Sequence, residues 1–343
     1  MAMTPENPVG LRGIAFVEFA HPDPLELHRL WSAFGFSLLH THRRLAVHHY
    51  TQGDIHLLIN EEADTHADHF QRDHGPCISA LGLYVDDPRK AYEAALARGA
   101  RPYQPGKGIR TTLDRPAIMG IGDSLIYFVD DHWLGAEFAP AAHPRVVKPC
   151  GFTRIDHLTN NVHKGTLTQW ADFYKNIFGF TEVRHFDIKG QSTGLYSFAL
   201  RSPDGSFCIP INEGTDKKSQ IEEYLRDYRG PGVQHLAFLT GNLLDSLDHM
   251  GGRINMLDID ADYYATVFGR VPNVKEDPAR IQKHQVLVDG DKDGYLLQIF
   301  TKNLLGPIFI ELIQRNNHTS FGEGNFGALF RSIERDQERR GVL

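Results

Sequence analysis

Cysteine is scarce in this sequence, with only Cys77, Cys150 and Cys208 among 343 residues. Three widely spaced cysteines predict neither a disulfide framework nor a zinc site. Apolar runs long enough to cross a bilayer are also lacking, and the first eight residues contain no apolar core of a signal peptide. We therefore expect a protein of the reducing cytoplasm that does not enter a membrane.

An excess of positive charge is absent as well. The formal net charge is −7 at pH 7, and the isoelectric point is about 6.2. Nucleic acids and anionic membrane surfaces attract basic faces, so neither is an expected partner. The composition, 41% hydrophobic and 23% charged, is ordinary for a globular protein. Because 343 residues exceed one typical core, we expect two domains or a duplication.

Three sequence patterns recur in the same order in the two halves of the chain. They are an apolar opening (11–19 and 152–158), a helical stretch ending in Phe-Gly-Phe (31–36 and 174–180), and a Gly-Pro strand followed by a helix (75–97 and 230–249). This order predicts a duplicated α+β fold, with a βαβββ module in each half and a sheet curved around a cleft. The expected bounds are 1–140 for the first domain, 141–151 for a link and 152–343 for the second.

Two histidines and one glutamate stand alone in apolar, strand-like segments of the second half. His157 and His235 each lie in such a segment, and Glu311 lies in the middle of a third. A buried carboxylate must become neutral, pair with a cation or bind a metal. Matching the repeats places Ala80 opposite His235, and Ala15 or Phe16 opposite His157, so the first half lacks these side chains.

Two imidazoles and one carboxylate are the facial triad of non-haem Fe(II), which leaves three coordination positions open. Each residue alone has another explanation, either a hydrogen-bonded core histidine or a glutamate paired with arginine. The sequence holds 19 histidines, so most must have other roles. His48, His49, His66, His69 and His74 are expected not to hold the metal.

The C-terminal segment predicts an amphipathic helix. Phe321–Asn325 forms a Gly-rich turn in which Asn325 is placed to cap the following helix. The apolar residues that then recur at helical spacing are Phe326, Leu329, Phe330 and Ile333. This apolar face either packs on the body of the protein or covers the mouth of the cleft.

The second half resembles the 4-hydroxyphenylpyruvate dioxygenase family of the vicinal-oxygen-chelate superfamily. The segments that carry the resemblance are 155–158, 186–190, 209–213, 218–224, 232–235, 295–300, 311–315 and 321–326, with looser matches at 7–13 and 50–60. The resemblance implies two open, barrel-like sheets. The first would be a vestigial domain, and the second would hold the active site and a closing C-terminal helix.

The same resemblance implies the roles of individual residues. One Fe(II) per chain would be bound by His157, His235 and Glu311. Catalytic polar residues would be Ser197, Asn212, Gln220 and Gln298, and substrate contacts would be Gln234, Phe300, Phe321, Asn325 and Phe326. Strict strand alternation points Gln234 away from the face of His235, so its role requires a bulge or twist in that strand.

The reaction implied by the resemblance is the conversion of 4-hydroxyphenylpyruvate and O2 to homogentisate and CO2, in tyrosine and phenylalanine catabolism. The partners would be an aromatic 2-oxo acid and O2, and a homo-oligomer is expected. Three alternatives stay open. A 4-hydroxymandelate synthase would use the same triad and substrate, an extradiol catechol dioxygenase would share the scaffold, and a binding protein would hold a small molecule without turnover.

Overall fold

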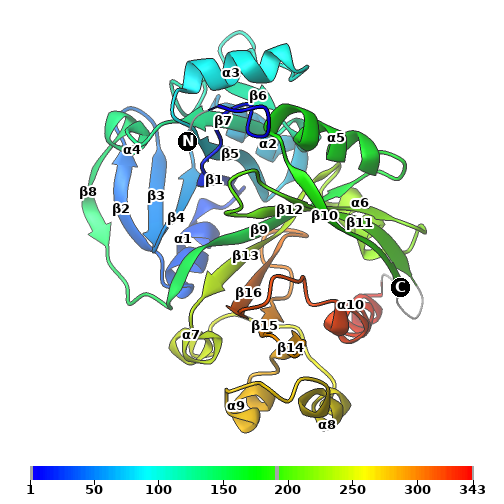
Figure 1. Ribbon diagram of the computed structural model, residues 1–343. Helices are drawn as coiled ribbons and strands as arrows, with labels where there is room; N and C mark the ends of the chain where they lie inside the picture. The colour runs from blue at the N-terminus through cyan, green and yellow to red at the C-terminus, as the bar shows by residue number, and fades with distance from the viewer. Residues whose placement is uncertain (1–2, 190–192, 342–343) are drawn as a thin grey trace.

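The computed structural model describes residues 3–189 and 193–341 (Figure 1). Residues 1–2, 190–192 and 342–343 lie outside this range. They include the start of the first expected domain, the end of the second, and Gly190, which ends one of the segments that carry the resemblance. Within it, the chain forms two curled eight-stranded sheets, one in each half, with helices around them. The predicted duplicated α+β architecture is therefore confirmed.

The first sheet has the strand order β6-β7-β5-β1-β4-β3-β2-β8. Its strands are β1 (Ile14–Ala20), β2 (Ser37–His42), β3 (Val47–Gln52), β4 (Ile55–Asn60), β5 (Cys77–Tyr84), β6 (Ala117–Met119), β7 (Leu125–Val129) and β8 (Phe138–Arg145). The helices of this half are α1 (Pro24–Ala33), α2 (His66–His74), α3 (Pro88–Ala97), η1 (Ile121–Asp123) and α4 (Trp133–Glu137). Residues 141–145 of the expected link thus belong to β8, which pairs with β2.

Helices α1 and α3 show how local sequence sets their starts. Each begins with an Asp-Pro pair, in which the aspartate is the N-cap and proline occupies the first helical position. The Asp23 carboxylate accepts a hydrogen bond from the Leu25 amide, and Asp87 accepts one from the Lys90 amide. Such caps satisfy amide groups that have no partner inside the helix.

The second sheet has the order β10-β11-β12-β9-β13-β16-β15-β14. Its strands are β9 (Phe152–Val162), β10 (Thr181–Lys189), β11 (Gly194–Arg201), β12 (Cys208–Gly214), β13 (Gly232–Thr240), β14 (Leu287–Gly290), β15 (Tyr295–Phe300) and β16 (Phe309–Asn316). The helices are α5 (Leu167–Phe178), α6 (Gln220–Asp227), α7 (Leu243–Met250), α8 (Ala261–Arg270), α9 (Pro278–Lys283), η2 (Glu323–Asn325) and α10 (Phe326–Arg339). Strand β9 pairs antiparallel with β13, and β13 pairs parallel with β16, which repeats the β1-β5-β7 arrangement of the first half.

The Phe-Gly-Phe repeats pack each half against the other. Phe36 stacks on Phe152 with ring centroids 6.5 Å apart, and it lies 5.4 Å from Phe238. In the opposite direction, Phe178 stacks on Phe128 at 6.2 Å. Aromatic pairs of this kind add about 0.5–1.5 kcal/mol each beyond the burial of their surface. The two halves therefore share one continuous hydrophobic core.

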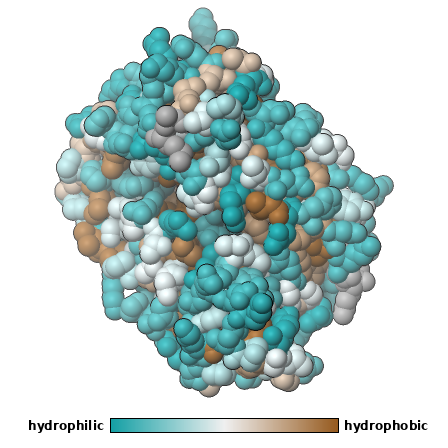
Figure 2. All heavy atoms as spheres, viewed as in Figure 1, coloured by the Kyte–Doolittle hydropathy of each residue, from teal (hydrophilic) through white to brown (hydrophobic). Residues whose placement is uncertain are grey.

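The outer surface is largely polar. The face shown in Figure 2 is mainly hydrophilic, with hydrophobic residues in small separate spots. Among the described residues, the large hydrophobic side chains that are exposed are Met3, Leu25, Val146 and Tyr196. No helix in the described ranges combines the length and apolar character needed to cross a membrane.

Candidate active site

Three neighbouring strands in the middle of the second sheet bring the predicted triad together. Ala237 on β13 is the register partner of both His157 on β9 and Glu311 on β16. His235 lies two residues before Ala237, and alternate residues of a strand share one face. The small side chain of Ala237 therefore leaves an open space that the three larger side chains surround.

The triad is compact and buried. His157 Nε2 lies 3.1 Å from Glu311 Oε2, and His235 Nε2 lies 3.5 Å from the same oxygen. The two imidazole rings meet nearly edge to face, with centroids 5.4 Å apart. Exposed fractions are 4% for His157, 9% for His235 and 3% for Glu311. These three residues thus present two nitrogens and one oxygen within reach of a single ion.

The electrostatics of the triad suit a bound cation. Burial raises the pKa of Glu311, but the two histidines more than offset this and lower it to about 2. Burial lowers the pKa of His157, but Glu311 and Asp156 outweigh it and raise the value to about 9. Burial also lowers the pKa of His235. No lysine or arginine in the described ranges forms an ion pair with Glu311. Without a metal, the positive charge beside Glu311 is therefore the proton on His157. A bound divalent ion would take the place of that proton.

A layer of charged residues behind the triad orients His157. Asp156 Oδ2 lies 2.8 Å from His157 Nδ1, on the side of the ring opposite Glu311. Arg315 donates two hydrogen bonds to Asp156. Its Nη1 also donates to the backbone oxygens of His318 and Ser320, at 3.1 and 2.6 Å. Metal-binding histidines usually have their second nitrogen fixed by a carboxylate or a carbonyl in this way.

A bulge in β13 places Gln234 on the same side as His235. The register between β13 and β9 shifts between Val233 and His235, so Gln234 has no partner in the ladder. As a result, Gln234 lines the same cavity as its neighbour, and its Oε1 lies 3.1 Å from His235 Nδ1. The conflict between strand alternation and the predicted role of Gln234 is resolved by this bulge.

The triad lies in the wall of a largely apolar cavity. The remaining lining residues, besides the triad and Gln234, are Thr159, Phe186, Ile188, Leu195, Ser197, Pro210, Asn212, Gln220, Gln298, Phe300, Phe309, Phe321, Phe326, Leu329, Phe330 and Ile333. They come from β9, β10, β11, β12, β15 and β16 of the curled sheet and from α6, α10 and the turn before α10. Eleven of these sixteen residues are apolar, six of them phenylalanines, and five are polar, so the cavity suits a flat ligand with polar ends.

Asn325 is the predicted pocket residue that does not line the cavity. It is fully buried, its Nδ2 donates to Gln298 Oε1 at 3.2 Å, and its Oδ1 accepts from Tyr263 and Arg270. It also makes no side-chain cap for α10. The turn directs this amide inward, toward Gln298, so the side chain does not form the expected cap, and a direct contact of Asn325 with the substrate stays a prediction.

Sequence reasoning missed several residues of the cavity, and strand alternation could have found some of them. Thr159 lies two residues after His157, and Phe309 lies two before Glu311, so each shares a face with a ligand. The Phe309 ring stacks on His235, with centroids 4.7 Å apart. Phe186, on the edge strand β10, contacts both Phe321 and Phe326. No local pattern predicts that long-range contact.

The apolar face of α10 lies over the cavity, where Phe326, Leu329, Phe330 and Ile333 all line it. In Figure 1, α10 lies beside β10 and β11. Polar contacts of buried side chains also hold the helix. Gln337 donates to Glu223 on α6 at 2.8 Å, and Ser332 donates to the backbone oxygen of Asp258 at 2.7 Å.

Strands β1, β5 and β7 of the first half carry other side chains at the positions that correspond to the triad. Gly82 is the register partner of both Phe16 and Tyr127, as Ala237 is of His157 and Glu311. Ala80 takes the place of His235. The rings of Phe16, Tyr127 and Trp133 fill the interior of this sheet, with Phe16 between the other two. The register therefore selects Phe16, rather than Ala15, as the counterpart of His157.

Comparisons with known proteins agree across the whole chain. A family model described as hydroxyphenylpyruvate dioxygenase, N-terminal, matches residues 5–139, and one for the glyoxalase/bleomycin resistance protein/dioxygenase superfamily matches 154–299. Protein MelA of Shewanella colwelliana is 56% identical, over 98% of this chain and 99% of its own. The 4-hydroxyphenylpyruvate dioxygenase of Legionella pneumophila is 42% identical, over 99% of each chain.

A solved structure is similar to this chain along almost all of its length. A mutant of 4-hydroxymandelate synthase from Streptomyces coelicolor matches with a TM-score of 0.81 at 26% identity, covering 95% of this chain and 99% of that one. Full-length identity above 40% to a named dioxygenase, together with an intact buried triad, leads to one conclusion. This chain belongs to the 4-hydroxyphenylpyruvate dioxygenase family of the vicinal-oxygen-chelate superfamily.

Proposed function

We propose that this protein converts 4-hydroxyphenylpyruvate and O2 to homogentisate and CO2, using one Fe(II) held by His157, His235 and Glu311. The observation that carries the proposal is the buried triad in the wall of an aromatic cavity. Two imidazoles and a carboxylate suit non-haem Fe(II), and they leave positions for an oxo acid and O2. The reaction belongs to aromatic amino-acid catabolism and would take place in the cytoplasm.

The donor set of the site fits iron for a physical reason. A carboxylate that is 3% exposed and has no lysine or arginine partner among the described residues is costly unless a cation compensates it. Bound Fe(II) would supply the coordination positions that bring O2 and the oxo acid together, while the electrons that reduce O2 would come from the substrate. The protein itself binds, orients and shields the substrate.

The aromatic side chains hold the substrate ring. Phe321 lies against His157 with centroids 5.8 Å apart, and Phe300 lies 6.5 Å from His235. A flat phenol ring between such faces is fixed in orientation, because offset and edge-to-face contacts are favoured. The apolar face of α10 excludes water from the same space, which protects reactive species from side reactions.

The polar groups fix the two ends of the substrate. Ser197 on β11 and Asn212 on β12 are register partners, so they lie side by side in the wall of the cavity. With Gln220, they are the candidates to anchor the phenol. Gln298 and Gln234 lie on the side of β13–β15, where their amides can donate to the oxo-acid group. Asn325 acts indirectly, by holding the Gln298 amide.

A second candidate is 4-hydroxymandelate synthesis, in which the benzylic carbon is hydroxylated instead of the ring. The structural likeness to 4-hydroxymandelate synthase favours keeping it. The same triad and oxo-acid group would serve both reactions, and the position of the ring would decide between them. Identification of the product formed by Fe(II)-loaded protein separates these reactions. A protein that binds the oxo acid without consuming O2 would support neither.

A further inference from the structure

A second group of two histidines and one glutamate lies in the first half of the molecule. His28 lies on α1, His48 on β3, and Glu61 directly after β4. His28 Nε2 lies 2.6 Å from Glu61 Oε1, and His48 Nε2 lies 3.3 Å from the same oxygen. The three residues are 20 and 13 positions apart in sequence, and only the fold brings them together.

Its geometry matches that of the catalytic triad closely. In both groups, two Nε2 atoms face one carboxylate oxygen, at 2.6 and 3.3 Å here and at 3.1 and 3.5 Å around Glu311. The rings of His28 and His48 meet at 76° with centroids 5.1 Å apart, and those of the catalytic pair meet at 82° and 5.4 Å. Both groups can therefore present two nitrogens and one oxygen to one ion.

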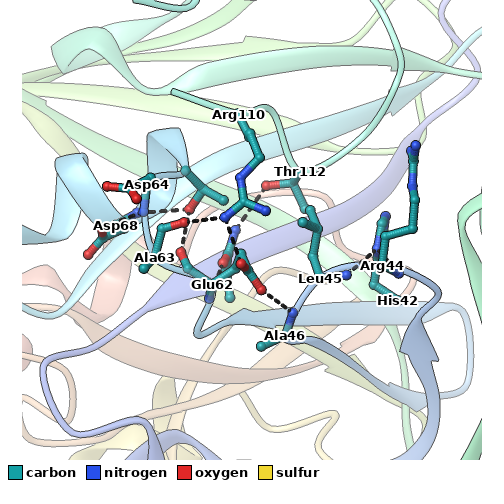
Figure 3. A network of polar contacts seen from close by, with 12 residues as sticks. His42, Arg44, Leu45, Ala46, Glu62, Ala63, Asp64, Asp68, Arg110 and Thr112 are labelled. Carbon is teal, nitrogen blue, oxygen red and sulfur yellow. Dashed lines mark hydrogen bonds and ion pairs between the residues drawn. The ribbon is translucent and has the colours of Figure 1, made fainter. Parts of the chain in front are cut away.

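His28 and Glu61 have supporting contacts of the kind that metal ligands usually have. The Nδ1 atom of His28 lies 2.7 Å from the hydroxyl of buried Tyr50, which fixes the ring and leaves Nε2 for a ligand bond. The backbone amide of Glu61 donates to the oxygen of Ala46 at 2.8 Å. The next residue, Glu62, accepts hydrogen bonds from Arg110 and from the Ala46 amide (Figure 3). Hydrogen bonds at positions 61 and 62 thus hold the backbone that carries the Glu61 carboxylate.

The site lies outside the barrel-like interior. His48 and His49 are neighbours on β3, so they point to opposite faces. His49 contacts Trp133 and Phe138 of the inner core, whereas His48 faces α1. The side chains of His28, His48 and Glu61 are 13%, 26% and 28% exposed. Water can therefore reach the site and complete the coordination of an ion.

We propose that His28, His48 and Glu61 bind a divalent transition-metal ion such as Zn²⁺ or Co²⁺, separately from the catalytic centre. Imidazole nitrogen and carboxylate oxygen are the usual zinc ligands besides thiolate, and a set of three leaves a place for water. Because the ligands come from α1, β3 and the end of β4, the ion fastens the helix to the sheet. His48 is the weaker ligand, since its buried Nδ1 has no hydrogen-bond partner in the described structure.

Asp64, Asp68 and His69 also lie close enough together to hold an ion, but we propose no metal site there. Asp68 already accepts from the Asp64 amide at 2.9 Å and pairs with Arg72 at 2.7 Å. Its carboxylate is therefore engaged without an ion. This makes His69→Ala a suitable control, because it removes a histidine from a nearby group that the proposal does not use.

The test isolates the new site in a Glu311→Gln background, which removes the catalytic carboxylate. Co²⁺ is added to the metal-free full-length protein, loosely held ions are removed by gel filtration, and the bound metal is counted. We expect two ions per chain in the wild type and one in E311Q. The combinations E311Q/E61Q and E311Q/H28A should hold none, and E311Q/H69A should keep one. In the single variant E61Q, the visible spectrum of bound Co²⁺ should lose the bands that come from this site.

Two further measurements show whether the loss of the ion is due to misfolding or to a change at the catalytic centre. Zn²⁺ should raise the melting temperature of E311Q, but not that of E311Q/E61Q, because an ion that binds only the folded state stabilises it. The single variant E61Q should retain the product and turnover of the wild type. The proposal is overturned if E311Q holds no ion, or if its ion persists in both E311Q/E61Q and E311Q/H28A.

Discussion

Arg315 and Asp156 form a two-pronged ion pair behind the triad, with Nε to Oδ1 at 2.7 Å and Nη2 to Oδ2 at 2.8 Å. Asp156 in turn fixes Nδ1 of His157. The pair thereby connects His157, a proposed metal ligand, to the 318–320 segment, which leads into the turn before α10. Orientation of the ligand and placement of the turn depend on the same arginine.

Asp156→Asn should weaken metal binding by about 10–100-fold, because the loss of such an outer partner releases the ligand ring and lowers its basicity. Iron affinity is measured by competition with a chelator, and turnover is measured at saturating iron. Asp245→Asn is a control, since Asp245 pairs with Arg280 on the exposed surface and such pairs contribute about 0–1 kcal/mol. Equal iron affinity in D156N and the wild type would show that Asp156 has no positioning role.

Glu311→Gln should lose one bound ion per chain and all dioxygenase turnover. Glutamine preserves the size of the side chain but removes the anionic ligand of the triad. Metal content after gel filtration and O2 uptake provide the two readouts. Glu182→Gln, which breaks only a partly exposed pair with Lys175, should leave both unchanged. Retention of near-normal iron and activity by E311Q would refute the assignment of the centre.

Gly322→Ala should reduce kcat/KM by about tenfold or more. Gly322 has φ of +79°, and a Cβ placed there would collide with the Gln298 amide. The left-handed backbone alone costs roughly 1–2 kcal/mol in a residue with a side chain, and the collision displaces a cavity residue as well. Gly165→Ala is the control, since it has φ of +85° and no atom within 4 Å of its Cβ. If both variants lose the same fraction of kcat/KM, the contact with Gln298 does not contribute to activity.

Glu18 should make the first half less stable as pH rises above about 4.5, the ordinary pKa of glutamate. Burial raises its pKa, although Thr112, Asn60 and Ser79 donate hydrogen bonds to it and lower the value in part. A raised pKa in the folded state favours the protonated form. The stability it contributes is therefore present at low pH and lost as pH rises through the folded pKa.

This effect is measured by comparing the free energy of unfolding of Glu18→Gln with that of the wild type from pH 4 to pH 8. The variant should gain relative stability by about 1.4 kcal/mol per pH unit until the raised pKa is reached, and none beyond it. Glu26→Gln, at an exposed position on α1, controls for the change in net charge. A difference that does not vary with pH would mean that Glu18 titrates equally in the folded and unfolded states.

The sequence predicted the triad because each ligand interrupts an apolar strand. His157, His235 and Glu311 stand out against neighbours that must be buried, and the repeat showed that the first half lacks them. The duplicated α+β architecture followed from the same repeat. These predictions rest on local pattern and chain order, which the fold preserves.

Other features depend on tertiary detail that the sequence does not display. The bulge that turns Gln234 toward the cavity breaks strand alternation, and a turn directs Asn325 away from the cavity and toward Gln298. The contacts of Phe186 with the start of α10 join distant segments. The grouping of His48 with His28 and Glu61 likewise joins residues that are 20 and 13 positions apart in the chain.

The most direct test supplies 4-hydroxyphenylpyruvate to the Fe(II)-loaded protein, records O2 and CO2, and identifies the product by chromatography. The account predicts homogentisate, with one CO2 released for each O2 consumed. 4-Hydroxymandelate would retain the site but contradict the proposed ring hydroxylation. No O2 uptake by protein that holds iron at the triad would contradict the proposed substrate and reaction.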